Sequence, residues 1–382
     1  MRNTISMACF QVVEKIFPFL SVYLISIFYE TSYLDRFGLS MFYVSTIISW
    51  STSGINVAAT KEFFSTNSSR LNGIYSLNII LSCLSIFIFF LTSYFFGEFE
   101  IWILALSSFA AFFASLFVFR KAICITKFEW KKLFISFILA NIFSFSLIIF
   151  FNLNHFQYVE LSIFVFYFIL YISLRLGINL RFNFNKEIIK YFFNEFGFLY
   201  FTGIVSGSVI YFFTIYSIEA SKHGIAALIT IGVQLITILQ FIPVALNRII
   251  FIRMAKGESI GFGKNIFILI GLTLIVSIPV YYTFTFIGRE YEEIVNKYFL
   301  ILVIASIFSS ISTLVGGSLV VKGFSKYWFL LTFLSTLLGF LVLVMFPTDS
   351  KVKSVFISLL VVYFNQFIFG YYLNEKFRIL PV

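Results

Sequence analysis

Acidic and titratable side chains are scarce in this chain of 382 residues. It has 17 Asp and Glu residues in total and two His residues, and 12% of its residues are charged. Metal sites and paired-carboxylate catalysis draw on these residue types. The composition therefore weighs against an enzyme, and we expect no cofactor and no metal site.

Cysteine is also rare, and one common energy-coupling motif is missing. The three cysteines, Cys9, Cys83 and Cys124, are odd in number and lie in or beside apolar segments, so we expect free thiols instead of a disulfide framework. No phosphate-binding loop of the G-x-x-x-x-G-K-[ST] type occurs. Direct coupling to nucleotide hydrolysis is therefore not expected.

Apolar residues, in contrast, make up 60% of the chain, including 57 Phe. This excludes a soluble globule, because too little polar surface remains to cover one. A helix needs about 20 apolar residues to span a bilayer, and twelve stretches qualify. The sequence thus predicts an all-α, polytopic membrane protein with spans near residues 10–29, 38–59, 74–96, 99–119, 133–151, 158–178, 196–217, 224–247, 265–287, 298–321, 327–346 and 354–373.

The basic residues are distributed unequally between the two sides of these spans. The formal net charge is +10, but the basic residues lie between apolar spans and form no soluble basic face, so we expect no nucleic-acid partner. Twenty of the 27 fall in connections on the side of the N-terminus, and six fall on the other side. Because basic connections stay inside, both termini are predicted to be cytoplasmic.

The predicted spans divide into two sets of six. Residues 1–178 would form one six-helix bundle and residues 196–382 a second, as in transporters built from a parallel repeat. The connection 179–195 mixes basic residues with Ile188, Ile189, Phe192 and Phe193 at helical spacing. That pattern predicts an amphipathic linker in the cytoplasmic membrane interface.

Two predicted spans carry a polar stripe. In the second span the spacing of three and four residues aligns Thr46, Ser49, Ser53, Asn56 and Thr60 on one face. The eighth span carries Thr230, Gln234, Thr237, Gln240 and Asn247, and each span follows a glycine, Gly38 or Gly224. Unsatisfied polar groups are unfavourable in hydrocarbon. The stripes therefore face either neighbouring helices or a shared wet cavity.

The first span holds adjacent charges, Glu14 and Lys15, with Gln11 one turn earlier. Either both charges reach the membrane interface, or Lys15 offers a cation and Glu14 a titratable carboxylate to a cavity between the bundles. In the seventh span, Gly203 and Gly207 have the G-x-x-x-G spacing, which predicts close helix packing.

Two segments resemble polysaccharide flippases. The first, from Tyr29 to Phe64, has Phe37 and Gly38, then Gly54 in mid-helix, then Ala58 to Lys61. The second, from Gly224 to Ala255, has an Ala-rich start, Gln234 and Pro243. Together with the twelve spans, these segments resemble the O-antigen flippase (Wzx-type) branch of the multidrug/oligosaccharidyl-lipid/polysaccharide (MOP) exporters. Phe251, Ile252 and Arg253 depart from the small polar run usual after the eighth span.

The resemblance implies a substrate, a location and partners. The protein would move an undecaprenyl-pyrophosphate-linked O-antigen repeat unit across a bacterial inner membrane by alternating access, coupled to H⁺ or Na⁺ or to the substrate gradient. It would work as a monomer, with a polysaccharide polymerase and a chain-length regulator as partners. The implied phosphate cations are Lys15, Arg248 and Arg253, Glu14 is the ion-coupling candidate, and the implied sugar contacts are Gln11, Trp50, Asn56, Tyr211, Gln234 and Gln240.

Two alternatives remain open. A drug/cation antiporter of the same superfamily would keep the fold but would be expected to carry more carboxylates in its lumen. A polysaccharide polymerase or membrane glycosyltransferase would be expected to carry a large outer loop with Arg and His, or acidic residues in an outer loop. The outer connections predicted here are no longer than about ten residues.

Overall fold

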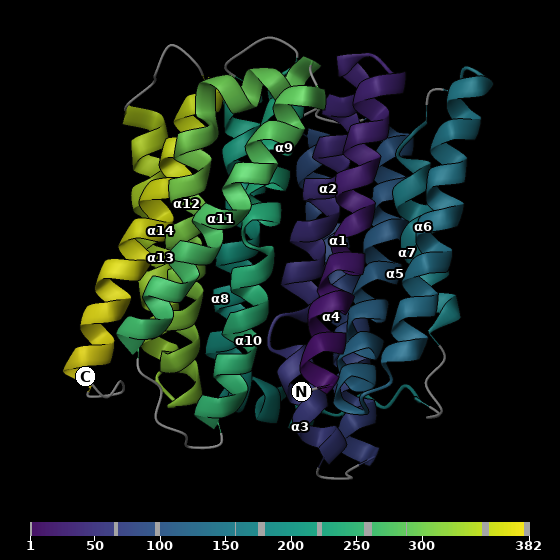
Figure 1. Cartoon of the computed structure of the whole chain (residues 1–382). Helices are drawn as coiled ribbons and strands as arrows, with labels where there is room; N and C mark the ends of the chain where they lie inside the picture. The colour runs from purple at the N-terminus through teal and green to yellow at the C-terminus, as the bar shows by residue number, and fades with distance from the viewer. Residues whose placement is uncertain are drawn as a thin grey trace. The chain divides into compact units, whose positions relative to one another are not determined.

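The computed structural model describes residues 2–64, 68–95, 100–156, 158–174, 180–219, 224–255, 262–287, 289–345 and 351–377. All the regular elements in these ranges are α-helices (Figure 1). They are α1 (Arg2–Phe28), α2 (Thr31–Thr52), α3 (Ile55–Phe64), α4 (Ser68–Phe95), α5 (Ile101–Thr126), α6 (Trp130–Leu153), α7 (Leu161–Ser173), α8 (Lys186–Glu219), α9 (Ile225–Leu239), α10 (Phe241–Ala255), α11 (Phe262–Ile287), α12 (Arg289–Val321), α13 (Ser325–Met345) and α14 (Lys351–Lys376).

These helices account for the twelve predicted spans. Ten spans correspond to one helix each, and the second and eighth correspond to the pairs α2–α3 and α9–α10. Among the described residues, eight helices are long and apolar enough to cross a membrane, and α7 and α9 are shorter apolar helices. The predicted all-α polytopic membrane fold is confirmed.

The predicted starts of the second and seventh spans differ from the structure. Gly38 was expected to end a loop, but α2 already begins at Thr31 and Gly38 is buried within it. The predicted linker has no separate helix in its described part, because residues 180–185 are non-helical and α8 continues unbroken from Lys186 to Glu219. Its position in the membrane interface stays a prediction.

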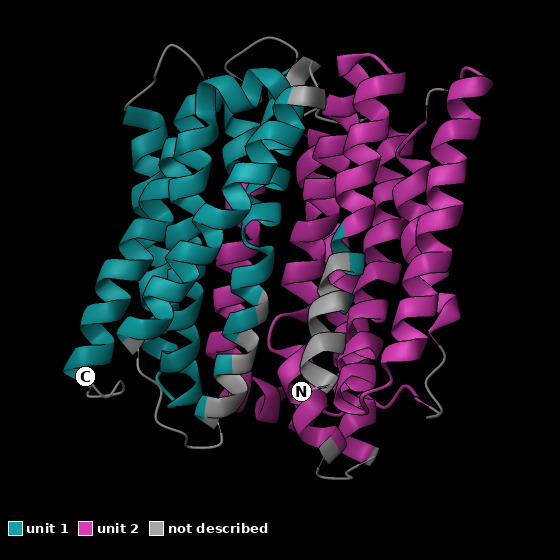
Figure 2. Ribbon diagram, in the orientation of Figure 1, with its two compact units in different colours: residues 1–15, 212–382 teal, residues 16–211 magenta. Residues whose placement is uncertain are grey.

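The helices are grouped by contacts into two compact units, coloured separately in Figure 2. One unit consists of residues 16–211, and the other of residues 1–15 with 212–382. The boundaries therefore fall inside α1 and inside α8. These units are defined by contacts, whereas the predicted bundles 1–178 and 196–382 are defined by a repeat, which stays a prediction.

Hydroxyl side chains inside the helices donate hydrogen bonds mostly to backbone carbonyls of their own helix. Ser51 donates to the carbonyl of Ile47 at 2.7 Å, Ser82 to that of Asn78 at 2.7 Å, and Ser306 to that of Leu302 at 2.7 Å. Such bonds, four residues back, remove the free-energy penalty of an unpaired hydroxyl in hydrocarbon. Many Ser and Thr residues can thus lie within apolar spans without marking a site.

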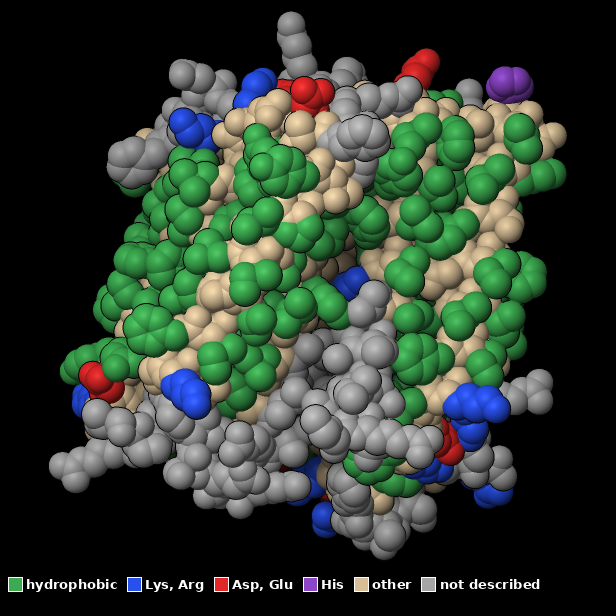
Figure 3. All heavy atoms as spheres, viewed as in Figure 1, with side chains coloured by type: hydrophobic (Ala, Val, Ile, Leu, Met, Phe, Trp, Pro, Cys, Tyr) green, Lys and Arg blue, Asp and Glu red, His purple; other side chains and the backbone are tan. Residues whose placement is uncertain are grey.

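Phenylalanine residues lie both in the core and on the outer surface. Phe17 is fully buried and stacks on Phe166 with ring centroids 3.8 Å apart, whereas Phe87 and Phe267 are 62% and 77% exposed. On the face drawn in Figure 3, hydrophobic side chains cover the flanks of the helices, and charged side chains lie mainly toward their two ends. This distribution fits helices surrounded by lipid.

Candidate functional site

The polar stripe of the second span contains a break in the helix. Helix α2 ends at Thr52, Ser53 has extended backbone dihedrals, and α3 starts at Ile55. Gly54 has a φ of +73°, and a Cβ there would lie 3.3 Å from the Phe196 carbonyl oxygen and 3.3 Å from the Tyr200 amide nitrogen of α8. Only glycine combines this left-handed backbone with such a close approach.

The stripe of the eighth span has a milder irregularity at Gln240, whose backbone dihedrals stay helical. Helix α9 ends at Leu239, α10 begins at Phe241, and Gln240 is the C-cap residue between them. The two breaks do not fall at equivalent places in their helices, because the first follows the 22 residues of α2, in which Gly38 is buried, and the second follows the 15 residues of α9, for which Gly224 is the N-cap. Discontinuous membrane helices commonly line transporter substrate sites, because backbone and amide groups become available there.

One predicted contact residue at or near each break has an unused amide atom. The Oδ1 atom of Asn56, two residues past the first break, is buried and makes no hydrogen bond within the described part of the chain. The Nε2 atom of Gln240, at the second break, is likewise buried and makes no hydrogen bond within the described part of the chain. A buried amide without a partner is unfavourable by roughly 1–3 kcal/mol. Asn56 and Gln240 are therefore the predicted contact residues near the two breaks that keep an unused amide atom for a polar ligand.

The middle of the first stripe packs against α8. A Cβ at Gly207 would lie 2.2 Å from the Ser49 Cβ, and one at Gly203 would lie 2.2 Å from the Ser53 Cβ. Helices α2 and α8 are therefore packed so closely that only glycine fits at these two positions of α8. Close packing of the Gly203–Gly207 motif is confirmed. Of the two interpretations left open for this stripe, helix packing holds for Ser49 and Ser53, and Asn56 is the member with an unused polar atom.

An aromatic cluster surrounds the same crossing. The Trp50 indole Nε1 donates to the Ser208 hydroxyl at 2.6 Å, and the Tyr211 hydroxyl lies 2.7 Å from that of Ser93. Phe89 connects them, with ring centroids 4.8 Å from Trp50 and 5.5 Å from Tyr211. Tyr211 is 2% exposed and Trp50 is half-buried. Two of the predicted sugar contacts thus lie in one cluster, and Trp50 is the more accessible of the two.

The charged end of α3 is tied to the start of α8. Lys61 donates to Glu195 at 3.1 Å, and this hydrogen bond raises the pKa of the Lys61 ammonium. The Tyr191 hydroxyl donates to Glu62. The short helix after the first break is therefore held at its far end by polar contacts to α8.

The second stripe is buried within the unit that contains residues 212–382. Thr230 donates to the Ala226 carbonyl at 2.7 Å, and Asn247 donates to the Ser310 carbonyl at 2.8 Å. Gln234 is 9% exposed, whereas Gln240 is half-buried. Within this stripe, Gln240 is therefore both partly accessible and left with an unused donor.

The remaining predicted site residues lie on α1 and α10. Lys15 is exposed and Glu14 half-buried, and both belong to the unit of residues 1–15 and 212–382. Trp50, Asn56 and Tyr211 belong to the unit of residues 16–211. Gln11, Arg248 and Arg253 lie within helices, but their side chains are outside the described part of the structure. The assignment of these residues to one site stays a prediction.

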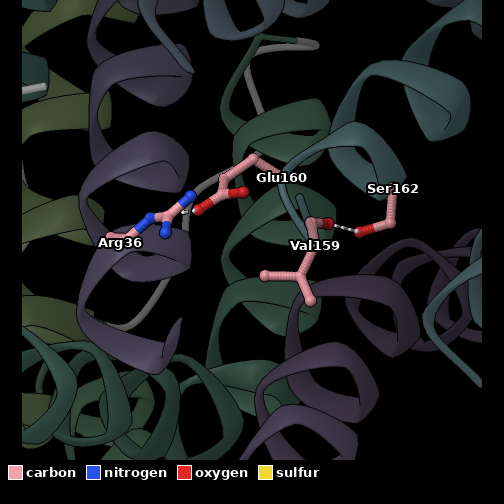
Figure 4. Close-up of polar contacts among 4 residues, drawn as sticks. All are labelled: Arg36, Val159, Glu160 and Ser162. Atoms are coloured by element: carbon pink, nitrogen blue, oxygen red, sulfur yellow. Dashed lines mark hydrogen bonds and ion pairs between the residues drawn. The ribbon is translucent and has the colours of Figure 1, made fainter. Parts of the chain in front are cut away.

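A buried ion pair is the feature that sequence reasoning missed. Arg36 of α2 donates through Nε to Glu160 Oε1 at 3.1 Å, and the Glu160 side chain is fully buried at the start of α7 (Figure 4). Arg36 Nη2 and Glu160 Oε2 make no hydrogen bond within the described residues. The available signal was two charges near the ends of apolar spans on the same predicted side, but Arg36 directly follows Asp35, and the sequence gives no reason to pair it with Glu160.

Comparison with known proteins shows similarity in fold. No protein-family model and no curated protein matches the sequence. The inward-facing conformation of a multidrug resistance MATE family transporter of the MOP superfamily matches with a TM-score of 0.66 and 12% identity over 98% of both chains. The outward-facing conformation of such a transporter matches with a TM-score of 0.66 and 13% identity, over 99% of this chain and 94% of that one.

A MATE protein in complex with MaL6 is also similar, with a TM-score of 0.64 and 12% identity over 99% of this chain and 95% of that chain. At these identities the likeness concerns the fold. The chain therefore has the all-helical fold of MATE transporters.

Proposed function

We propose that the protein is a flippase that moves undecaprenyl-pyrophosphate-linked polysaccharide repeat units, of the O-antigen type, between membrane leaflets by alternating access. The observation that carries the proposal is the break in the second span at Ser53 and Gly54, close to the unused buried amide oxygen of Asn56, in a chain with the fold of MATE transporters. The unused amide nitrogen of Gln240, between α9 and α10, adds to it. The resemblance of residues 29–64 and 224–255 to polysaccharide flippases supports the substrate class.

The chemistry of this substrate requires a polar route through the membrane. A pyrophosphate and its sugars cannot cross hydrocarbon unaided, whereas the polyprenyl tail can stay in lipid. Amide groups and aromatic faces suit sugars, and cations suit the pyrophosphate. The proposed sugar contacts are Gln11, Trp50, Asn56, Tyr211, Gln234 and Gln240, and the proposed phosphate cations are Lys15, Arg248 and Arg253.

The same proposal includes location and partners. The protein would lie in a bacterial inner membrane with both termini in the cytoplasm, as the basic residues favour. Transport would be driven by H⁺ or Na⁺ with Glu14 as the coupling carboxylate, and a polysaccharide polymerase and a chain-length regulator would act on the exported units.

Deleting the gene and restoring it tests this function. We expect the deletion to abolish surface polysaccharide while radiolabelled lipid-linked repeat units still form and accumulate on the cytoplasmic face, because synthesis would not require the protein. Failure of the labelled units to form in the deletion strain would instead identify a synthetic enzyme of the pathway.

A drug/cation antiporter is the second candidate, because the solved structures of this fold cited above include multidrug resistance transporters. The same deletion strain distinguishes it. An antiporter predicts increased sensitivity to cationic drugs with normal surface polysaccharide, whereas the flippase predicts normal drug sensitivity with polysaccharide lost.

Replacement of Lys15 tests its proposed contact with the pyrophosphate. We expect Lys15→Ala to impair export and Lys15→Arg to largely preserve it, because a positive charge within hydrogen-bonding distance is what the phosphate requires. Surface polysaccharide is measured per molecule of inserted protein, since an interfacial lysine would alter insertion alone. Normal export by an Ala variant at normal abundance would remove Lys15 from the mechanism. Glu14→Gln is the companion variant, and unchanged dependence of export on the ion gradient would exclude coupling through Glu14.

A further inference from the structure

The last two helices enclose a groove that none of the proposed transport residues occupies. Helices α13 and α14 pack side by side (Figure 1), and a groove of about 340 Å³ runs between them. Its walls are mostly apolar, with Leu330, Leu334 and Leu338 on α13 and Phe369 and Leu373 on α14. A groove of this composition fits a hydrocarbon chain.

The groove opens on an exposed surface of α13 and α14. Leu334 is 61% exposed, Phe369 is 54% exposed and Tyr372 is 57% exposed, although all three line the groove. Large apolar side chains exposed on membrane helices face lipid. The occupant therefore comes from the bilayer, and no aqueous solute needs to be considered.

The length of the groove matches one membrane leaflet. On α13 it extends from Tyr327 to Leu338, a separation of eleven residues that corresponds to a rise of about 16 Å along a helix. The hydrocarbon core of a bilayer is about 30 Å thick, so one leaflet contributes about 15 Å. A phospholipid acyl chain spans this distance, whereas an undecaprenyl chain of eleven isoprene units is much longer than the groove.

Cationic and aromatic groups gather at one end of the groove. Lys326 lies one turn before Leu330 on α13, and Lys376 lies one turn after Tyr372 on α14. The start of α13 lies beside the end of α14, where the rings of Tyr327 and Phe377 have centroids 5.0 Å apart. Both exposed lysines therefore come to the same end of the groove, which Tyr327 and Tyr372 also line. An acidic residue, Glu375, is also near this end. It lies one turn from Tyr371, and Tyr371 does not line the groove. Lysines attract anionic headgroups, and tyrosines favour the membrane interface.

We propose that this groove is a binding site for an anionic glycerophospholipid of the leaflet nearest the C-terminal end of α14. One acyl chain lies between α13 and α14, and the phosphate lies between Lys326 and Lys376. The site is independent of the transported substrate, so it holds whether or not the protein is a flippase.

Native mass spectrometry of the purified full-length protein tests the site. The delipidated protein is titrated with phosphatidylglycerol, with phosphatidylcholine of the same chains, and with undecaprenyl phosphate. We expect one phosphatidylglycerol to bind, and its affinity to fall roughly fivefold for each lysine removed in Lys326→Ala and Lys376→Ala. Leu334→Trp fills the groove and is expected to abolish this binding, with Leu330→Trp as a second filling variant.

Two matched controls isolate the groove and its charges. Leu337→Trp alters an exposed residue of α13 that does not line the groove, and Lys351→Ala with Lys353→Ala removes two charges from the other end of α14. Both controls should bind phosphatidylglycerol as the unmodified protein does. Equal binding of phosphatidylcholine, binding that survives both Trp variants, or preferential binding of undecaprenyl phosphate at the groove would each overturn the proposal.

Discussion

Replacing Gly203 with leucine is expected to prevent α2 and α8 from packing and to destabilise the protein severely. A Cβ at this position would lie 1.7 Å from the Ser53 Oγ and 2.2 Å from the Ser53 Cβ, and the second atom cannot rotate away. The helices must separate, which disrupts the hydrogen bond from Trp50 to Ser208 at 2.6 Å. Overpacking together with this loss should lower the free energy of unfolding by about 3 kcal/mol or more.

Thermal unfolding in detergent measures this effect, and two variants serve as controls. Gly271→Leu introduces the same side chain at a helical glycine with no atom within 4 Å of the added Cβ, so it should be tolerated. Gly203→Ala should be destabilising alone and partly rescued when combined with Ser53→Gly, because the clashing Cβ is then removed. Additive effects of these two changes would contradict a direct contact.

Replacing Arg36 with methionine should give the second large loss. Glu160 has a fully buried side chain, and Arg36 Nε is 3.1 Å from its Oε1. Without the guanidinium, the buried carboxylate must either stay charged in a low-dielectric environment or take up a proton, and both are unfavourable near neutral pH. Breaking a buried ion pair from one side costs about 3–5 kcal/mol, whereas replacing both partners can be nearly neutral. We therefore expect Arg36→Met to lower the unfolding free energy strongly and Arg36→Met/Glu160→Gln to recover much of the loss.

An exposed ion pair provides the matched control for the Arg36 and Glu160 variants. Lys297 and Glu293 are joined at 2.9 Å on α12, but both side chains are substantially exposed. Water and salt screen such pairs, so Lys297→Met should leave thermal unfolding unchanged. If Arg36→Met behaves like Lys297→Met, the buried pair does not stabilise the fold. If the double variant is as unstable as Arg36→Met alone, the loss comes from packing instead of charge.

The sequence predicted part of the candidate site, and the part it missed is non-local. Asn56 and Gln240 could be selected because polar residues recur on one helical face, and Gly54 could be noted as a glycine in mid-span. The break in the second span depends on tertiary contacts, since Gly54 is held against the Phe196 carbonyl and the Tyr200 amide of α8. Tyr211 is likewise buried through contacts with residues distant in the sequence, including Ser93, 118 residues away.

The sequence by itself determined the all-helical class, the twelve spans and the approximate position of each, because the length of an apolar run is a local property that the bilayer thickness selects. The tertiary structure alone decided which polar groups are used in packing and which remain available. Ser49 and Ser53 occupy the same stripe as Asn56, but a neighbouring helix covers the first two and leaves an amide oxygen of the third without a partner. The ion pair of Arg36 and Glu160, which are 124 residues apart, also forms only because the packed helices bring the two side chains together. Periodicity defines the face on which a side chain lies, but only the packed helices define what that face contacts.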